Sequence, residues 1–296
     1  MVPTLSLIGF GEAGMQFARC NAWAAQARVF DRLTLQAGSG ADAKRADYAA
    51  LGVTPCADMA GAVGGADVIL SLVTADECAA AAAEAARHIA PGALFFDMNS
   101  VAPGTKEAAA IAMEQAGGRY VDVAVMAPVD PAGAAVPLLV SGPHAGDGAA
   151  MLAALGFTNI RIVAGAVGRA SSIKMIRSVM IKGIEALTAE MMLAADRAGV
   201  VDDVLASLGG DWATRADYNL DRMMVHGVRR AAEMREVVST LDQLGVEPWM
   251  TRGTVERQDA IGQRRLSPAG GLDDKLQRLA NPAPSGAPAA RQGASA

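Results

Sequence analysis

Cysteine and clusters of basic residues are scarce in this sequence. Its three cysteines, Cys20, Cys56 and Cys78, lie far apart and form no Cys-x-x-Cys pair. We therefore expect no disulfide framework and no metal site, and a reduced compartment fits best. The 26 basic residues are outnumbered by 31 acidic ones, which gives a formal net charge of −5 without any lysine or arginine run. Such a surface suits neither nucleic acid nor anionic lipid as a partner.

Long uninterrupted apolar runs are also missing. No segment approaches the roughly 18 consecutive apolar residues that a membrane span needs. The alanine-rich stretch at 79–83 is ended by Glu84. The N-terminus lacks the basic segment of a secretory signal peptide, and a glycine motif already begins at Gly9. We therefore expect a cytoplasmic protein that has no membrane segment and binds a small-molecule substrate.

Short apolar runs alternate with alanine-rich helical stretches in the first half of the chain. This alternation is typical of a doubly wound, mostly parallel sheet covered by helices on both faces. It predicts an N-terminal Rossmann domain of the α/β class over residues 1–164. The expected strands are 4–8, 27–30, 68–73, 93–97, 121–125 and 137–140, and the expected helices are 12–25, 76–89 and 103–115.

The character of the sequence changes after about Gly165. Residues 165–266 show helical periodicity without a convincing strand, and glycines or proline interrupt it at intervals. This segment predicts an all-α domain. From Ser267 the composition shifts to Ser, Pro, Gly and Ala, so we expect a flexible tail over residues 267–296.

The sequence GFGEAG at 9–14 matches the pattern G-x-G-x-x-G between an expected strand and an expected helix. In a dinucleotide site the first glycine permits a tight turn, the second lets the backbone approach a pyrophosphate, and the third allows close helix packing. A purely structural turn and an S-adenosylmethionine loop remain alternatives. The expected cofactor-binding residues of this loop are Gly9, Phe10, Gly11, Glu12, Ala13 and Gly14.

Asp31 ends the next expected strand, twenty positions after Gly11. A carboxylate at this place binds the ribose hydroxyls of the adenosine and repels a 2'-phosphate, so it favours NAD over NADP. Arg32 follows directly and softens this preference, which keeps NADP as the second candidate cofactor. An ordinary surface acid at a strand end is the alternative reading of Asp31.

Other candidate residues follow the ends of later strands, where open α/β sheets place their ligands. Val73, Thr74 and Asn99 are expected to contact the cofactor. Ser100 is a candidate for substrate binding and catalysis, and its alternative role is to cap the helix after Pro103.

A lysine stands near the start of the helical half. Ser171, Lys174 and Ser178 are spaced i, i+3 and i+7, so they share one face of a helix. A lysine in a partly buried site is a plausible acid/base for interconverting an alcohol and a carbonyl. The alternative is a solvated surface lysine, which the apolar neighbours Ile173 and Met175 argue against.

Four motifs together resemble those of the β-hydroxyacid dehydrogenases, the group that includes 3-hydroxyisobutyrate dehydrogenase and 6-phosphogluconate dehydrogenase. They are the glycine loop, DMNSVAP at 97–103, YVDVAVMAPV at 120–129 and GAVGRASSIK at 165–174. The resemblance implies a Rossmann domain, a helical domain and Lys174 as the catalytic residue. Ser178 occupies the place of the family's asparagine, which makes it a third catalytic candidate.

The third motif departs from the family pattern. Met126, Ala127 and Pro128 replace small residues whose backbone amides contact the substrate carboxylate in the family, and Pro128 has no amide hydrogen. Further candidates for substrate binding are Ser171, Arg177 and Trp212.

Residues 171–193 are apolar on nearly every side of the expected helix. A helical domain of about a hundred residues can hardly bury such a helix alone. We therefore expect a homodimer with this helix at or near the interface, as the resemblance also implies.

These features predict an enzyme that transfers hydride between NAD(P) and the alcohol or carbonyl group of a small hydroxy compound. An imine reductase and a non-catalytic NAD-binding protein are the alternatives. Imine reductases generally have another residue in place of Lys174, and a binding protein needs no lysine there.

Overall fold

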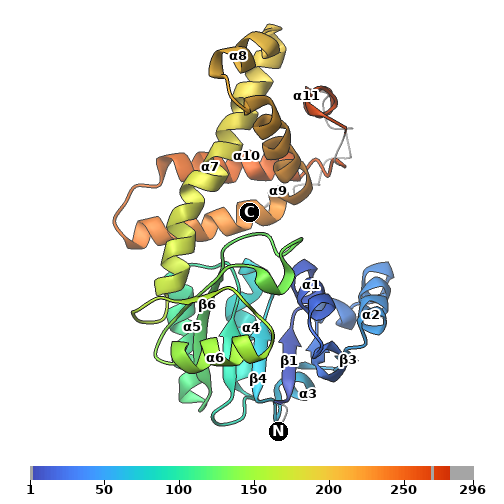
Figure 1. The fold of residues 1–296 in the computed structure, drawn as a ribbon, viewed down its shortest axis with the longest axis vertical. Coiled ribbons are helices and arrows are strands. Elements are labelled where there is room, and N and C mark those ends of the chain that lie inside the picture. The colour runs from blue at the N-terminus through green and yellow to red at the C-terminus, as the bar shows by residue number, and fades with distance from the viewer. Residues whose placement is uncertain (1–2, 268–269, 281–296) are drawn as a thin grey trace, which may run out of the picture. The chain divides into compact units, whose positions relative to one another are not determined.

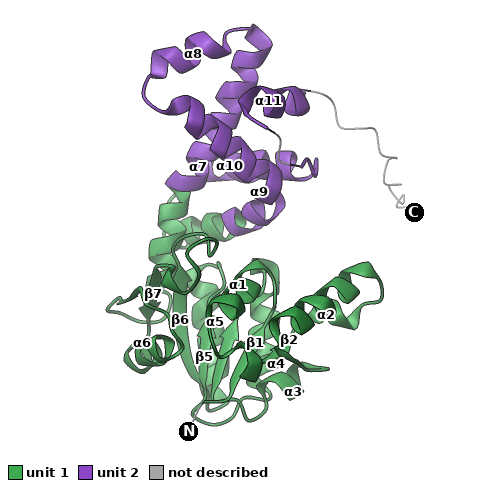
Figure 2. Ribbon diagram, turned by 45° about the vertical axis from the view of Figure 1, so that its right-hand side comes forward, with its two compact units in different colours: residues 1–179, 235–248 green, residues 180–234, 249–296 purple. Residues whose placement is uncertain are grey.

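A computed structural model describes residues 3–267 and 270–280 of the chain. The chain forms two compact units, which Figure 2 distinguishes by colour: residues 1–179 with 235–248, and residues 180–234 with 249–296. The first unit contains an eight-stranded sheet, and the described part of the second is helical. The expected fold class, a Rossmann domain followed by a helical domain, is confirmed.

The strand order of the sheet is β3-β2-β1-β4-β5-β6-β7-β8. Figure 1 labels β3, β1, β4 and β6, which follow one another in this order across the sheet. All neighbouring strands are parallel except β6 and β7. The order reverses between β1 and β4, and doubly wound sheets bind their ligands at the carboxyl ends of such strands. The strands are β1 (Leu5–Ile8), β2 (Arg28–Phe30), β3 (Thr54–Pro55), β4 (Val68–Ser71), β5 (Leu94–Asp97), β6 (Arg119–Val125), β7 (Leu138–Ser141) and β8 (Ile160–Ile162).

Two apolar cores cover the two faces of this sheet. Because successive side chains of a strand point to opposite faces, Leu94 and Phe96 belong to one core and Phe95 to the other. The first core also takes residues from α1 (Glu12–Cys20), α2 (Ser39–Leu51) and α6 (Ala145–Ala154). The second takes mostly alanine and methionine from α3 (Met59–Val63), α4 (Cys78–Ala86) and α5 (Pro103–Gln115).

Several elements differ from the sequence expectation. Helix α1 ends at Cys20, five residues early, because the side-chain amide of Asn21 donates to the carbonyl of Phe17 and closes the last turn. The helices α2, α3 and α6 and the short strands β3 and β8 were not anticipated. Strand β7 is antiparallel to β6.

The second unit is built from α8 (Val201–Leu208), α10 (Trp249–Gly262) and α11 (Leu272–Ala280), with parts of α7 (Arg169–Ala198) and α9 (Trp212–Gln243). Methionine, leucine and alanine side chains form its core. Within it α9 and α10 pack closely, since a Cβ on Gly227 would lie 2.7 Å from the Cα of Gly262. A buried ion pair joins Arg230 to Glu185, and the buried Lys182 pairs with the half-buried Glu233.

The boundary between the units differs from the one expected at residue 165. The first unit extends into α7 as far as Val179 and includes the segment 235–248 at the end of α9. In that unit Glu236 accepts a hydrogen bond from the backbone amide of Ala102 (2.8 Å), and Gln243 packs against Gly104. These contacts explain why the segment belongs with the sheet.

Residues 272–280 differ from the expected flexible tail. They form helix α11, whose Leu276 and Leu279 lie in the core of the second unit. Lys275 is also buried, and its ammonium contacts Asp217 and Asp221. The amino-acid composition did not predict this helix, because its apolar face consists of only three leucines. Residues 268–269 and 281–296 of the expected tail lie outside the described residues.

Within residues 3–267 and 270–280, no helix is both long and apolar enough to span a bilayer. The same residues contain no group of histidine, cysteine and acidic side chains arranged to hold a metal ion.

Candidate active site

The glycine loop lies between β1 and α1, where each glycine has a distinct surrounding. Gly9 has a φ of +83°, and a Cβ on it would lie 2.6 Å from the carbonyl oxygen of Leu72, so only glycine fits. A Cβ on Gly14 would lie 3.1 Å from the oxygen of Gly9, which marks a close helix contact. At Gly11 a Cβ would meet nothing within 4 Å, so this backbone faces open space.

The first turn of α1 follows this open space. Its N-cap, Gly11, has no side chain to accept a hydrogen bond from the first backbone amides. Amides at a helix N-terminus bind anions such as a pyrophosphate. Glu12 is exposed, Ala13 is half-buried and Phe10 is fully buried. The loop therefore fits a dinucleotide phosphate.

Asp31 lies directly after β2 and holds this loop in place. One carboxylate oxygen accepts from the amide of Phe10 at 2.8 Å and the other from the amide of Leu33 at 3.0 Å. Arg32 is exposed and pairs with Glu77 at 2.5 Å. The structure thus places Asp31 beside the loop, as a ribose-binding acid requires, and turns Arg32 towards another side chain.

Sequence reasoning missed Lys44 of α2. Its buried ammonium donates to the carbonyl of Phe10 at 2.6 Å and pairs with Asp47 at 3.0 Å. The charge also lies 6.0 Å from the centre of the Phe10 ring. The loop is therefore supported from two sides, by Asp31 and by Lys44.

Three expected cofactor residues follow β4 and β5. Val73 is half-buried, and the exposed Thr74 precedes a short 3-10 helix. Asn99 is buried, and its amide nitrogen donates to Asp97 (2.8 Å) and to Ser71 (3.0 Å). Its Oδ1 atom has no hydrogen-bond donor among the residues that the structure describes. This acceptor is buried, so the contacts of Asn99 hold the turn after β5 in place.

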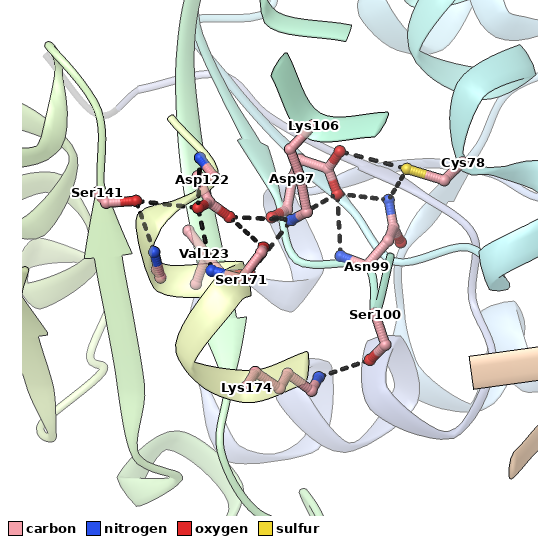
Figure 3. Close-up of polar contacts among 12 residues, drawn as sticks. Cys78, Asp97, Asn99, Ser100, Lys106, Asp122, Val123, Ser141, Ser171 and Lys174 are labelled. Atoms are coloured by element: carbon pink, nitrogen blue, oxygen red, sulfur yellow. Dashed lines mark hydrogen bonds and ion pairs between the residues drawn. The ribbon is translucent and has the colours of Figure 1, made fainter. Parts of the chain in front are cut away.

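Lys174 and Ser100 meet at the same edge of the sheet. Ser100 follows β5, and Lys174 lies in the second turn of α7. The Nζ atom of Lys174 donates to the Oγ atom of Ser100 at 2.5 Å, and both residues are half-buried (Figure 3). The structure thus brings these two catalytic candidates together.

The two serines that share a helix face with Lys174 have other contacts. Ser178 donates its hydroxyl hydrogen to the carbonyl of Lys174 at 2.9 Å, within α7. Ser171 is buried and donates to Asp122 at 2.6 Å. Ser171 was expected to bind substrate, but its hydroxyl is hydrogen-bonded to Asp122. Helical spacing alone did not predict this contact.

A charge cluster lies deeper in the protein than the Lys174–Ser100 pair, and Figure 3 draws it above that pair. The Nζ atom of Lys106 is 3.1 Å from an oxygen of Asp97 and 3.3 Å from an oxygen of Asp122, and all three side chains have no exposed surface. Asp97 also accepts from the hydroxyl of Tyr120 at 2.6 Å and from the thiol of Cys78 at 3.3 Å. Sequence reasoning did not assign this cluster.

The cluster fixes the ionisation of its members. Burial alone lowers the pKa of Lys106, but the carboxylates of Asp97 and Asp122 outweigh it and raise that pKa. Burial raises the pKa of Asp122, whereas the Lys106 charge and hydrogen bonds from Ser171 and Ser141 reverse this and leave it lowered. Burial, together with the charge of Asp97, raises the pKa of the Tyr120 hydroxyl and that of the Cys78 thiol.

The remaining substrate candidates are dispersed. Met126 is half-buried and follows β6, and Ala127 and Pro128 are exposed. Arg177 is exposed and donates to the carbonyl of Met126 at 3.1 Å, so it lies beside this segment. Trp212 starts α9 in the second unit, where Arg215 stacks 5.7 Å from its ring.

Comparisons with known proteins agree with this geometry. A model of the NAD-binding domain of 6-phosphogluconate dehydrogenase matches residues 4–155, about half of the chain. This chain belongs to the 6-phosphogluconate dehydrogenase-like, β-hydroxyacid dehydrogenase family. A second model, a domain of unknown function (DUF1932), matches residues 195–261.

Solved structures extend the comparison. A conserved hypothetical protein from Sinorhizobium meliloti 1021 is 41% identical, with a TM-score of 0.70 over 94% of this chain and 96% of that chain. Two others share the fold. The Mycobacterium tuberculosis 3-hydroxyisobutyrate dehydrogenase, solved with L-serine, is 16% identical (TM-score 0.71, 95% of this chain and 100% of that chain). A reductive aminase from Aspergillus terreus, solved with NADPH4, cyclohexanone and allyl amine, is 19% identical (TM-score 0.57, 94% and 99%).

The family and the glycine loop together define the broad activity. The protein is an NAD(P)-dependent oxidoreductase of the hydroxyacid dehydrogenase type. The expected cofactor class, NAD(P), is therefore confirmed.

Proposed function

We propose that this protein transfers hydride between NAD(P) and the alcohol or carbonyl group of a small hydroxy compound, with Lys174 as the acid/base. The observation that carries the proposal is the 2.5 Å contact between the Nζ of Lys174 and the Oγ of Ser100. This pair follows the carboxyl end of β5, on the edge of the sheet where the glycine loop follows β1. A polar pair at that edge is suited to hold the reacting oxygen of a substrate.

The nicotinamide, when bound, supplies or accepts the hydride. In the reductive direction the ammonium of Lys174 hydrogen-bonds the carbonyl oxygen of the substrate and then gives its proton to the alkoxide oxygen. In the oxidative direction the neutral amine of Lys174 takes the proton from the alcohol oxygen. Ser100 orients the Nζ atom by accepting one of its hydrogens. Ser178, whose hydrogen is used within α7, contributes only as an acceptor.

The segment after β6 and Arg177 are proposed to recognise the substrate. Pro128 cannot donate a backbone hydrogen bond, so an anionic group needs another donor there. Arg177 lies one helical turn after Lys174, and its guanidinium reaches the carbonyl of Met126. A guanidinium carries five N–H donors, so those not used by Met126 can bind a carboxylate. The substrate class that fits is therefore a small hydroxy acid or its keto counterpart.

NAD is the proposed preferred cofactor. Both carboxylate oxygens of Asp31 accept backbone hydrogen bonds, which keeps the negative charge fixed beside the loop. A fixed carboxylate repels a 2'-phosphate. Arg32, the residue that would favour NADP, is paired with Glu77.

A homodimer is the proposed assembly, because α7 carries a stripe of exposed apolar side chains. Five of them are between 38% and 65% exposed in the single chain: Ile176, Met180, Ile181, Ile184 and Leu187. Four of these recur at i, i+4, i+8 and i+11, which is the spacing of one helix face. A second copy of this chain would remove that face from water.

Imine reduction is the second candidate function. The likeness to the reductive aminase supports it at the level of the fold. Lys174 argues for the alcohol and carbonyl reaction, since the resemblance places another residue there in imine reductases. A panel of ketoacids, hydroxyacids and cyclic imines, followed by NADH absorbance, separates the two. A non-catalytic NAD-binding protein would turn over none of them.

The decisive test replaces Lys174. Lys174→Ala should reduce turnover by roughly 10²–10⁴-fold, the usual contribution of a positioned proton donor, and leave the NADH affinity measured by fluorescence unchanged. Lys174→Arg should restore little, because a guanidinium does not deprotonate at accessible pH. Ser172→Ala is the matched control, because this hydroxyl only bonds the carbonyl of Gly168 within the same helix. Full activity of Lys174→Ala would disprove the lysine mechanism.

A further inference from the structure

A single buried cation joins two carboxylates beneath the Lys174–Ser100 pair. Lys106 lies in the first turn of α5, and its side chain has no exposed surface. Its Nζ atom contacts a side-chain oxygen of Asp97 and one of Asp122, and it also donates to the carbonyl of Asp97 and, at 3.4 Å, to that of Val123. Asp97 and Asp122 stand opposite each other on β5 and β6. The ammonium therefore bridges two adjacent strands at their ligand-binding edge.

One arm of this bridge leads to Ser100. Asp97 accepts from the backbone amide of Asn99 at 3.0 Å and from its side-chain amide at 2.8 Å. These bonds fix the turn after β5, and Ser100 is the next residue. The position of the Ser100 hydroxyl thus depends on where Asp97 is held.

The other arm leads to Lys174. Asp122 accepts from the backbone amides of Gly168 (3.0 Å) and Ser171 (3.2 Å) and from the hydroxyl of Ser171 (2.6 Å). These groups form the start of α7, which has several unpaired amides like every helix N-terminus. Asp122 therefore caps the N-terminus of the helix that carries Lys174 (Figure 3). Its partner Ser171 lies three residues before Lys174.

We infer that Lys106 is a positioning residue, which holds the start of α7 against the turn after β5 so that Lys174 stays on Ser100. The inference rests on the proposed function of Lys174. Without the ammonium two carboxylates on neighbouring strands would repel each other, and like charges at this distance in a buried site are strongly unfavourable. They would separate, or one would take up a proton. Either change would move the turn after β5, which carries Ser100, relative to the start of α7, which carries Lys174.

The lysines of the chain permit a direct test. The sequence contains only five, Lys44, Lys106, Lys174, Lys182 and Lys275. Protein with ¹³C-labelled lysine therefore gives few side-chain NMR signals, and Lys174→Arg identifies the one from Lys174. The change in its titration midpoint between wild type and Ser100→Ala measures the contact with Ser100, because an acceptor bound to the ammonium favours the charged form. Ser100→Ala should lower this midpoint by about one pH unit.

A double-mutant cycle then separates positioning from long-range charge. If Lys106 holds the pair together, Ser100→Ala should lower the midpoint by less than half as much in the Lys106→Met background. A direct effect of the Lys106 charge on Lys174 would instead add to the Ser100 effect and leave its size unchanged. The full Ser100→Ala shift in Lys106→Met protein would overturn the inference.

Two further variants keep the test decisive. Tyr120→Phe removes another hydrogen bond to Asp97 but lies on neither arm, so the full Ser100 shift should persist in it. Ser171→Ala keeps every charge and removes only a bond between Asp122 and α7, so it should reduce the Ser100 shift if Lys106→Met does not fold. A full shift in Ser171→Ala would then overturn the inference. The readout needs no substrate, so it is independent of the turnover test of Lys174→Ala.

Discussion

The ammonium of Lys174 donates to the hydroxyl of Ser100 at 2.5 Å, although 74 residues separate them in the chain. The contact joins the turn after β5 to the second turn of α7. Both side chains are half-buried, whereas the Lys106 cluster below them is sealed from water. The site therefore combines an accessible proton donor, Lys174, with a buried charge cluster that supports it.

Cofactor preference tests Asp31 directly. Asp31→Asn keeps an acceptor for the amide of Phe10 but removes the charge, so the loop should hold its shape. We expect wild-type kcat/KM to be higher with NAD(H) than with NADP(H), and the ratio to fall at least about tenfold in Asp31→Asn as the repulsion of a 2'-phosphate is lost. Arg32→Ala serves as the control and should change the ratio little. If wild-type kcat/KM with NADP(H) equals or exceeds that with NAD(H), Asp31 does not set the preference and Arg32 becomes the candidate.

The lowered pKa of Asp122 makes stability depend on pH in the acid range. Burial alone would raise this pKa, but the Lys106 charge and the hydroxyls of Ser171 and Ser141 bring it below its ordinary value of 3.8. A carboxyl with a lower pKa in the folded state stabilises that state above its unfolded pKa, and this stabilisation is lost as pH falls through the folded pKa.

Asp122→Asn should therefore lower the free energy of unfolding at pH 7 by roughly 3–5 kcal/mol, because it breaks a buried ion pair. The difference from wild type should shrink as pH falls below about 4, where the wild type also begins to lose the charge. Urea unfolding at pH 7 and pH 3 measures this. Asp42→Asn, at an exposed carboxylate, is the control and should show little effect at either pH. A constant difference would mean that the ionisation of Asp122 contributes nothing.

The sequence predicted the sheet and the glycine loop because both depend on local patterns. The alternation of apolar strands with helices, and the glycines at 9, 11 and 14, need no knowledge of distant residues. Ser100 was proposed from its place after a strand, and Lys174 from its helical spacing together with the family resemblance. Their contact could not be derived from spacing, since it depends on how β5 and α7 are placed by the sheet.

Lys106 was missed for a physical reason. A lysine in a helix is expected at the surface, and only two carboxylates from neighbouring strands make its burial favourable. The available signal was Asp122, an acid inside the apolar run 120–125, which requires a buried counter-charge. The contact of Ser171 with Asp122 could not be derived either, because helical spacing defines a face but not what that face contacts.

Helix α11 should contribute to the stability of the second unit. Leu276 is 2% exposed and packs in its core. Leu276→Ala should therefore cost about 2–5 kcal/mol of unfolding free energy, the usual range for a buried leucine. Gln277→Ala on the exposed side of the same helix is the matched control and should cost little. Wild-type stability of Leu276→Ala would mean that α11 contributes nothing to the stability of this unit.

The exposed stripe of α7 leads to a prediction about assembly. Met180 and Leu187 are 65% and 55% exposed and lie two turns apart, so they mark the stripe. Light scattering should show a dimer of wild-type protein at micromolar concentration. A charge at the centre of an apolar interface is costly to bury, so Met180→Glu with Leu187→Glu should shift the protein to monomer while its circular dichroism stays the same.

Leu244→Glu provides the control for this change. Leu244 is also an exposed leucine (58%), but it lies in the loop after α9, outside the stripe. This variant should remain dimeric, since a glutamate at a solvated position costs little. A wild-type monomer would refute the dimer, and a dimer that survives the double glutamate variant would show that another surface forms the interface. Loss of the dimer only in the stripe variant assigns the interface to α7.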